Sequence, residues 1–149
     1  MFELVQPDRG TPIGKRLQAL TFPYLRALRT AREENKPLPR PRNYIIITDG
    51  EATDAYVLQT HLVTVADTLD MLDCPEWQLG FQFVQIGNDA SATEFLARLD
   101  DDGGLLKRDI VDTVKTSHEI KSGENDDTLV KKILLGGINR KWDYQKAAK

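Results

Sequence analysis

The segment NYIIIT, Asn43 to Thr48, places the strongest constraint on the fold of this chain. It is rich in β-branched residues, carries no charged side chain and lacks the polar–apolar alternation of a strand with one solvated face. Such a segment predicts a β-strand that is covered on both faces. Strands of this kind occur mostly in parallel sheets that are flanked by helices.

Helical patterns stand on both sides of this segment. After Pro12, and again over residues 58–72, apolar side chains recur at spacings of three and four, which is typical of one face of a helix. A shorter helix is predicted within residues 88–99 and a final helix within residues 128–142. The first stripe consists of Ile13, Leu17, Leu20, Tyr24 and Leu28, and the second of Leu58, Leu62, Val65, Leu69 and Leu72.

Further strands are predicted at residues 2–7, 78–87 and 108–114, and residues 115–127 form a polar segment that predicts an exposed, flexible loop. Strands separated by helices favour parallel pairing through right-handed crossovers. The expected fold is therefore α/β, with a mainly parallel sheet and helices on both faces. A chain of 149 residues has the size of one ordinary domain.

Composition narrows the function classes. No apolar run reaches the roughly 18 residues of a membrane span, and the N-terminus lacks a secretory signal pattern. The single Cys74 forms no internal disulfide, which fits a reducing compartment. The net charge is −3 and the basic residues are scattered along the chain, so the sequence does not indicate nucleic-acid binding. We expect a cytoplasmic protein that binds neither membranes nor nucleic acid.

Asp49 ends the apolar strand, at the sheet edge where parallel α/β proteins place their binding sites. Glu51 and Asp54 follow it closely, and carboxylate and hydroxyl oxygens are the ligands that suit Mg²⁺ or Mn²⁺. The alternative is that Asp49 stabilises the N-terminus of the following helix, where an acid is favoured.

Two further segments offer oxygen ligands near the same edge. Thr11 is predicted to cap a helix that begins at Pro12, and its hydroxyl could also face a cation beside Asp49. The segment DASAT, which begins at Asp89, is similar to a D-x-S-x-S/T cation motif, but its position favours a helix start. Ser91 and Glu94 are spaced as a capping box for that helix, and Asn88 or Asp89 could cap it instead.

The segments GTPIGKRL, NYIIITDGEATD, WQLGFQFVQIGND, RDIVDTV and ILLGGINRKWD, taken in order, resemble a von Willebrand factor A domain of the intracellular fungal type. The resemblance implies a Rossmann-like sheet and protein recognition through a metal-ion-dependent adhesion site, in which an acidic side chain of the partner completes the coordination. Thr11 matches the second-loop threonine of the family and Asp49 its third-loop aspartate. Glu51, Asp54 and Asp89 would lie at the rim of the site.

This sequence departs from the family at the first motif. The family's D-x-S-x-S motif has no counterpart before residue 10, so residues 1–149 are expected to form a single, N-terminally incomplete domain that lacks the first two strands. Without them, Tyr44 to Thr48 would form an exposed edge strand, and exposed apolar edges pair readily with other chains.

The leading hypothesis is a non-catalytic protein-interaction module with a degenerate cation site that binds Mg²⁺ or Mn²⁺ weakly or not at all. Its partner is a protein, bound through the cation or through the strand Tyr44–Thr48. One alternative is a Mg²⁺-dependent phosphoryl-transfer or hydrolytic enzyme that uses Asp49 as metal ligand or nucleophile. Another is a structural subunit that pairs through the exposed strand.

Overall fold

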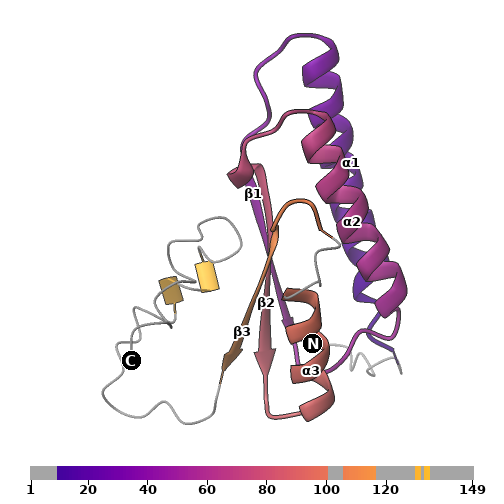
Figure 1. The fold of residues 1–149 in the computed structure, drawn as a ribbon, viewed down its shortest axis with the longest axis vertical. Helices are drawn as coiled ribbons and strands as arrows, with labels where there is room; N and C mark the ends of the chain where they lie inside the picture. Colours follow the sequence, from indigo (N-terminus) through magenta and orange to yellow (C-terminus); the bar gives the residue numbers. More distant parts are fainter. Residues whose placement is uncertain (1–9, 101–105, 117–129, 132, 135–149) are drawn as a thin grey trace, which may run out of the picture.

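The structure is a computed structural model that describes residues 10–100, 106–116, 130–131 and 133–134. Helices and strands alternate along the chain (Figure 1), as the sequence predicts for the α/β class. In chain order the elements are α1 (Ile13–Glu33), β1 (Arg42–Thr48), α2 (Ala55–Met71), the short 3₁₀ helix η1 (Glu76–Gln78), β2 (Leu79–Ile86), α3 (Ala90–Asp100) and β3 (Val111–Thr116).

The strands form a three-stranded parallel sheet in the order β1-β2-β3. The register aligns Tyr44 with Phe81 and Phe81 with Val111, so alternate residues of all three strands share one face. This arrangement is compatible with a Rossmann-like fold. Of the described helices, none combines the length and the apolar character that crossing a membrane requires.

One hydrophobic core joins α1, α2 and α3 to the sheet. Phe81 and Phe83 of β2 are fully buried and belong to a single cluster with apolar residues of all three helices. These helices therefore lie over the same face of the sheet, and α1 and α2 run side by side (Figure 1). On the other face, the side-chain amide of Asn43 donates a hydrogen bond to the carbonyl of Leu134 at 3.0 Å.

The helical stripes predicted from spacing are largely confirmed. In α2, Leu58, Leu62, Val65 and Leu69 are buried as expected. In α1 the prediction is wrong at one position, since Leu20 is 56% exposed and the neighbouring Thr21 is buried in its place. The buried face of α1 consists of Ile13, Gly14, Leu17, Thr21, Tyr24, Leu28 and Ala31.

The expectation that Asn43–Thr48 is covered on both faces is wrong. Ile45 is 40% exposed and Ile47 is 65% exposed, while Tyr44 on the other face stacks on Phe81 with ring centroids 5.7 Å apart. The continuous burial expected here belongs to β2, whose residues from Leu79 to Gln85 are all buried. The two strands differ in burial because β2 has a neighbouring strand on both sides, whereas β1 is the end strand of the described sheet.

Strand β3 lies slightly later in the chain than predicted. It runs from Val111 to Thr116, so Lys115 and Thr116 belong to the strand and not to the predicted loop. The rest of that loop and the strand predicted at residues 2–7 lie outside the described residues. Within the predicted final helix, residues 130, 131, 133 and 134 are helical, and the remainder lies outside the described residues.

Candidate functional site

A tight turn follows β1 and carries Asp49. The hydroxyl of Thr48 donates to the carbonyl of Gly50 at 2.9 Å, and the N–H of Gly50 donates back to that hydroxyl at 3.3 Å. The turn leaves the side chain of Asp49 exposed, and among the described residues no group hydrogen-bonds its carboxylate. Asp49 therefore does not cap α2 through a hydrogen bond among the described residues, and its two oxygens are available to an external ligand.

The loop that holds Thr11 meets the loop that follows Asp49. The N–H of Thr53 donates to the carbonyl of Thr11 at 3.1 Å, which fixes the two loops against each other. Helix α1 begins at Ile13, its N-cap is Pro12, and no side chain of the cap residue bonds to the first turn. The prediction that Thr11 caps this helix is therefore wrong, and its side chain lies exposed beside the helix start.

Asp54 supplies the cap that α1 lacks locally. Its Oδ1 accepts the N–H of Gly14 at 3.0 Å and its Oδ2 accepts the N–H of Lys15 at 2.8 Å, across 40 and 39 residues of sequence. The first N–H groups of a helix have no partner within the helix and carry a partial positive charge, so a carboxylate is the best partner for them. Asp54, whose prediction as a rim residue of a cation site stays a prediction, binds α1 to the loop before α2.

Gly14 lets the two helices approach closely at the same point. It is buried, and a Cβ atom at this position would lie 2.5 Å from the backbone nitrogen of Leu58. Only glycine fits such a contact without moving a backbone. Glycine in a helix is unfavourable by about 1 kcal/mol relative to alanine, so a glycine in the first turn was the signal in the sequence for this contact.

Asp89 caps α3. The sequence leaves open whether Asn88, Asp89 or a Ser91–Glu94 capping box does so. Its Oδ1 accepts the N–H of Ala92 at 2.8 Å and the hydroxyl of Ser91 at 2.7 Å. The bonds from the Ala92 N–H and then from the Ser91 hydroxyl hold the pKa of Asp89 below its ordinary value of 3.8. Ser91 lies inside the helix, so the Ser91–Glu94 capping box is not formed.

A buried histidine joins α2 to α1. The Nε2 atom of His61 lies 2.7 Å from the hydroxyl of Thr21, and that hydroxyl also donates to the carbonyl of Leu17 at 2.7 Å. Because a hydroxyl has a single proton, the ring must be the donor in its bond with Thr21. Burial lowers the pKa of His61 below its ordinary value of 6.5, so the ring is neutral near pH 7.

The carboxylates predicted for a cation site thus have different roles. Asp54 and Asp89 hold helix N–H groups, whereas Asp49 and Glu51 are exposed. In the part of the chain that the structure describes, no three His, Cys, Asp or Glu side chains are grouped so that they could hold a metal ion. The pairing of Thr11 with Asp49 around Mg²⁺ or Mn²⁺ stays a prediction.

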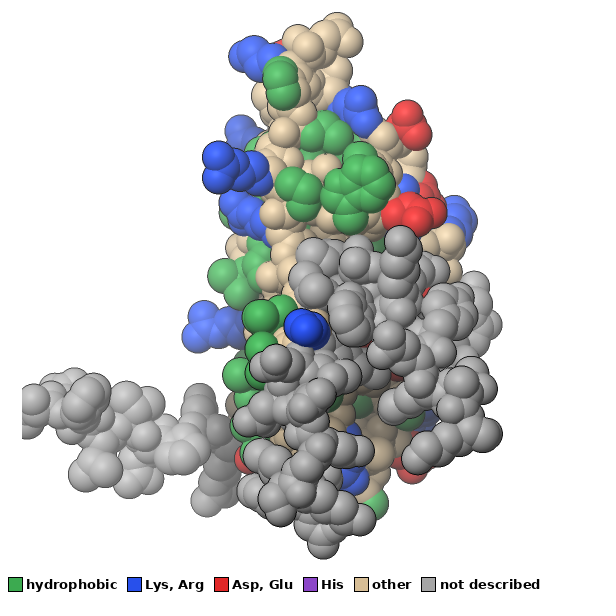
Figure 2. All heavy atoms as spheres, turned by 90° about the vertical axis from the view of Figure 1, so that its left-hand side faces the viewer, with side chains coloured by type: hydrophobic (Ala, Val, Ile, Leu, Met, Phe, Trp, Pro, Cys, Tyr) green, Lys and Arg blue, Asp and Glu red, His purple; other side chains and the backbone are tan. Residues whose placement is uncertain are grey.

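The open side of β1 is the second candidate site. A groove of about 360 Å³ runs between β1 and the first turns of α1, with Leu17, Leu20 and Tyr44 to Ile46 among its walls. Figure 2, which views the molecule from the side opposite α1 and α2, shows hydrophobic side chains along one side of the surface that the described residues form. The exposed Ile45 and Ile47 lie on this face, because the register places them with Gln82 and Val84.

Comparison with protein-family models, with curated proteins and with solved structures finds no match for this chain. Its function is therefore inferred from the residues and their geometry.

Proposed function

We propose that this chain is a non-catalytic protein-interaction module that binds an extended segment of a partner protein along the outer edge of β1. One observation carries the proposal. In the described sheet β1 has a neighbour on one side only, and its Ile45 and Ile47 side chains are 40% and 65% exposed.

The edge of a sheet is a ready template for another strand. Its outward N–H and C=O groups pair with an added strand, and alternate side chains of that strand provide specificity. On one face the added strand would lie beside Ile45 and Ile47. On the other face its side chains would enter the groove beside Leu20, which is 56% exposed. Burial of apolar surface on both faces would favour the complex.

The resemblance to a von Willebrand factor A domain supports recognition of a protein but implies a different route, through a cation held by Thr11 and Asp49. Two protein oxygens leave most of the coordination sphere of Mg²⁺ to water, so we expect weak binding. The hydrogen bonds of Asp54 and Asp89 to helix N–H groups support this expectation, because these carboxylates already have partners. We therefore propose that recognition does not depend on the cation.

The proposal is tested by affinity capture from cells with the full chain as bait. Ile47→Lys places a charge on the exposed edge, and Ile86→Lys is the matched control, since Ile86 is 45% exposed on the central strand. We expect Ile47→Lys to lose the captured partners and Ile86→Lys to keep them, with unchanged melting curves for both variants.

Asp49→Ala and an EDTA wash complete the experiment. The proposal predicts that both leave the captured set unchanged. Loss of partners with Asp49→Ala and with EDTA, together with normal capture by Ile47→Lys, would show recognition through a cation and contradict the proposal. Turnover of a generic phosphate ester in Mg²⁺ that Asp49→Ala abolishes would instead support the enzyme alternative.

A further inference from the structure

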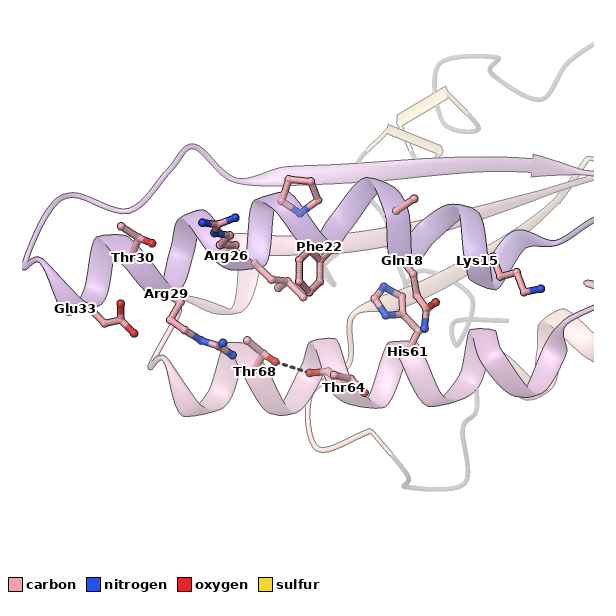
Figure 3. Close-up of a pocket in the computed structure, with 13 residues that line it drawn as sticks. Lys15, Gln18, Phe22, Arg26, Arg29, Thr30, Glu33, His61, Thr64 and Thr68 are labelled. Carbon is pink, nitrogen blue, oxygen red and sulfur yellow. Dashed lines mark hydrogen bonds between the residues drawn. The ribbon is translucent and has the colours of Figure 1, made fainter.

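A second groove follows helices α1 and α2 and shares no lining residue with the groove beside β1. Its volume is about 1130 Å³, and it reaches from Lys15 to Glu33 along α1, with His61, Thr64 and Thr68 on the α2 side (Figure 3). At a rise of 1.5 Å per residue, this stretch of α1 is about 27 Å long. A groove of this length suits a helix better than a small molecule, whose pockets measure about 300–1,000 Å³.

The middle of the groove is apolar. Ala19, Phe22 and Pro23 line it, and Phe22 is 68% exposed although it is the largest apolar side chain there. Leu25 adds a half-buried contact beside them. Aromatic side chains exposed in a groove between helices are typical anchor points for a partner side chain.

The rim of the groove is basic. Lys15, Arg26 and Arg29 line it, and Glu33 is the one acidic side chain among the lining residues. In the described residues none of these three cations forms an ion pair with a carboxylate. They therefore form a positively charged rim on a chain whose net charge is −3.

Three other arginines of the described chain have partners within the fold, whereas Arg16 and Arg40 are exposed like the cations of the groove. Arg108 donates to Asp70 at 2.8 Å and to two backbone carbonyls. Arg42 lies over the Tyr24 ring at 4.5 Å, and Arg32 donates to the carbonyl of Asp73. Lys15, Arg26 and Arg29 form no such bonds among the described residues, so their charges are available to a ligand of the groove.

We propose that this groove, which follows the solvent-facing side of α1 beside α2 (Figure 3), binds an acidic amphipathic helix of a protein partner. The apolar face of that helix would pack on Phe22 and Ala19, and its carboxylates would pair with Lys15, Arg26 and Arg29. Nucleic acid and anionic membranes fit less well. Three cations beside an apolar centre, on an acidic chain, are a small footprint for a polyanion. This inference goes beyond the proposed function, because it uses a different surface and a different kind of partner segment.

The test is a selection with the full chain against displayed helical peptides of about 18 residues, the length that spans the groove. Apolar residues are fixed at helical spacing, and the other positions are drawn equally from Glu, Lys, Gln and Ala. We expect the selected peptides to carry more Glu than Lys and their binding to weaken with salt. No selection, or selection without an excess of Glu, would overturn the proposal.

Variants then locate the binding. The double variant Arg26→Glu and Arg29→Glu should weaken binding of the selected peptides at least about tenfold, and Phe22→Asp should do the same. The matched control is Arg40→Glu with Arg98→Glu, which changes the net charge equally at exposed positions outside the groove and should stay within about twofold. Equal losses in both double variants would contradict the proposal.

Two further arms test nucleic acid and membranes as ligands of the groove. Duplex DNA and anionic phospholipid vesicles are titrated with the same variants, and binding of either that requires Arg26 and Arg29, without binding of acidic peptides, would overturn the inference. Ile47→Lys should leave peptide binding unchanged. Failure of the β1 proposal and failure of this one are therefore distinguishable.

Discussion

The first N–H groups of helices α1 and α3 both donate to an aspartate carboxylate, but one aspartate is adjacent in sequence and the other is distant. Asp89 immediately precedes α3 and caps its first turn, whereas Asp54 reaches α1 from 40 residues further along the chain. The local cap stabilises one helix. The distant cap, Asp54, also joins α1 to α2. The close approach at Gly14 and the bond between Thr21 and His61 hold the same two helices together. The same chemistry therefore serves secondary structure in one region and tertiary structure in the other.

Gly14→Ala should give the largest effect. Its new Cβ would lie 2.5 Å from the backbone nitrogen of Leu58, so α1 and α2 must separate. We expect a loss of about 3 kcal/mol in the free energy of unfolding, measured by urea denaturation. Gly50→Ala is the control, because nothing lies within 4 Å of the added atom. Equal stability of both variants would contradict the tertiary contact described for α1.

Asp54→Ala should cost less, about 2 kcal/mol, because it removes two charge-assisted hydrogen bonds but creates no clash. Asp54→Asn keeps one acceptor oxygen and should lose about half as much. Glu51→Ala, at an exposed position of the same loop, should leave the urea midpoint unchanged. If Asp54→Ala and Glu51→Ala have the same urea midpoint, the bonds of Asp54 to α1 do not contribute to the free energy of unfolding.

The bond between Thr21 and His61 predicts a pH dependence for the α1–α2 pair. Burial lowers the pKa of His61 in the folded chain, so the unfolded chain takes up the proton first as the pH falls. Stability should be constant above the ordinary value near 6.5 and should decrease as the pH falls below it. His61→Gln should remove this decrease between about pH 7 and pH 5.

Asp89→Ala should give the smallest effect and a local one. Hydrogen exchange should become faster at the first amides of α3, with no change at the start of α1. The pKa of Asp89 is lowered in the fold, so its stabilisation is present above the ordinary value of 3.8 and is lost as the pH falls through the lower, folded-state pKa. Faster exchange at α1 in this variant would remove the distinction between the two caps.

Local patterns explain what the sequence predicts correctly. The spacing of apolar residues located α1 and α2, the segment at residues 78–87 was predicted as the strand that is β2, and the acid before Ala90 was among the possible caps of α3. These features depend on residues a few positions apart. An edge position for β1 was expected only from the resemblance, as a consequence of two missing strands, which stays a prediction; β1 is the end strand of the described sheet.

The sequence predictions are wrong or incomplete where a residue's burial or hydrogen-bond partner depends on residues far away in the sequence. The exposure of Ile47 depends on which strands flank β1, and the role of Asp54 depends on a helix 40 residues away. Basic residues that are scattered in the sequence come together in the fold, since helical spacing aligns Lys15, Arg26 and Arg29 along one groove. The exposure of Ile47 and the role of Asp54 have no local signature, whereas the alignment of the three cations follows from their spacing on α1.

The most direct measurement is a thermal melt of the full chain in Mg²⁺, Mn²⁺ and EDTA, with Asp49→Ala and Asp54→Ala alongside. A ligand that binds only the folded chain raises the midpoint. Our account, in which Asp54 joins α1 to α2 and recognition needs no cation, predicts one midpoint for the wild type in all three conditions. It also predicts an equal decrease for Asp54→Ala in each condition and no change for Asp49→Ala. A rise in Mg²⁺ or Mn²⁺ that Asp49→Ala abolishes would contradict it and establish a working cation site.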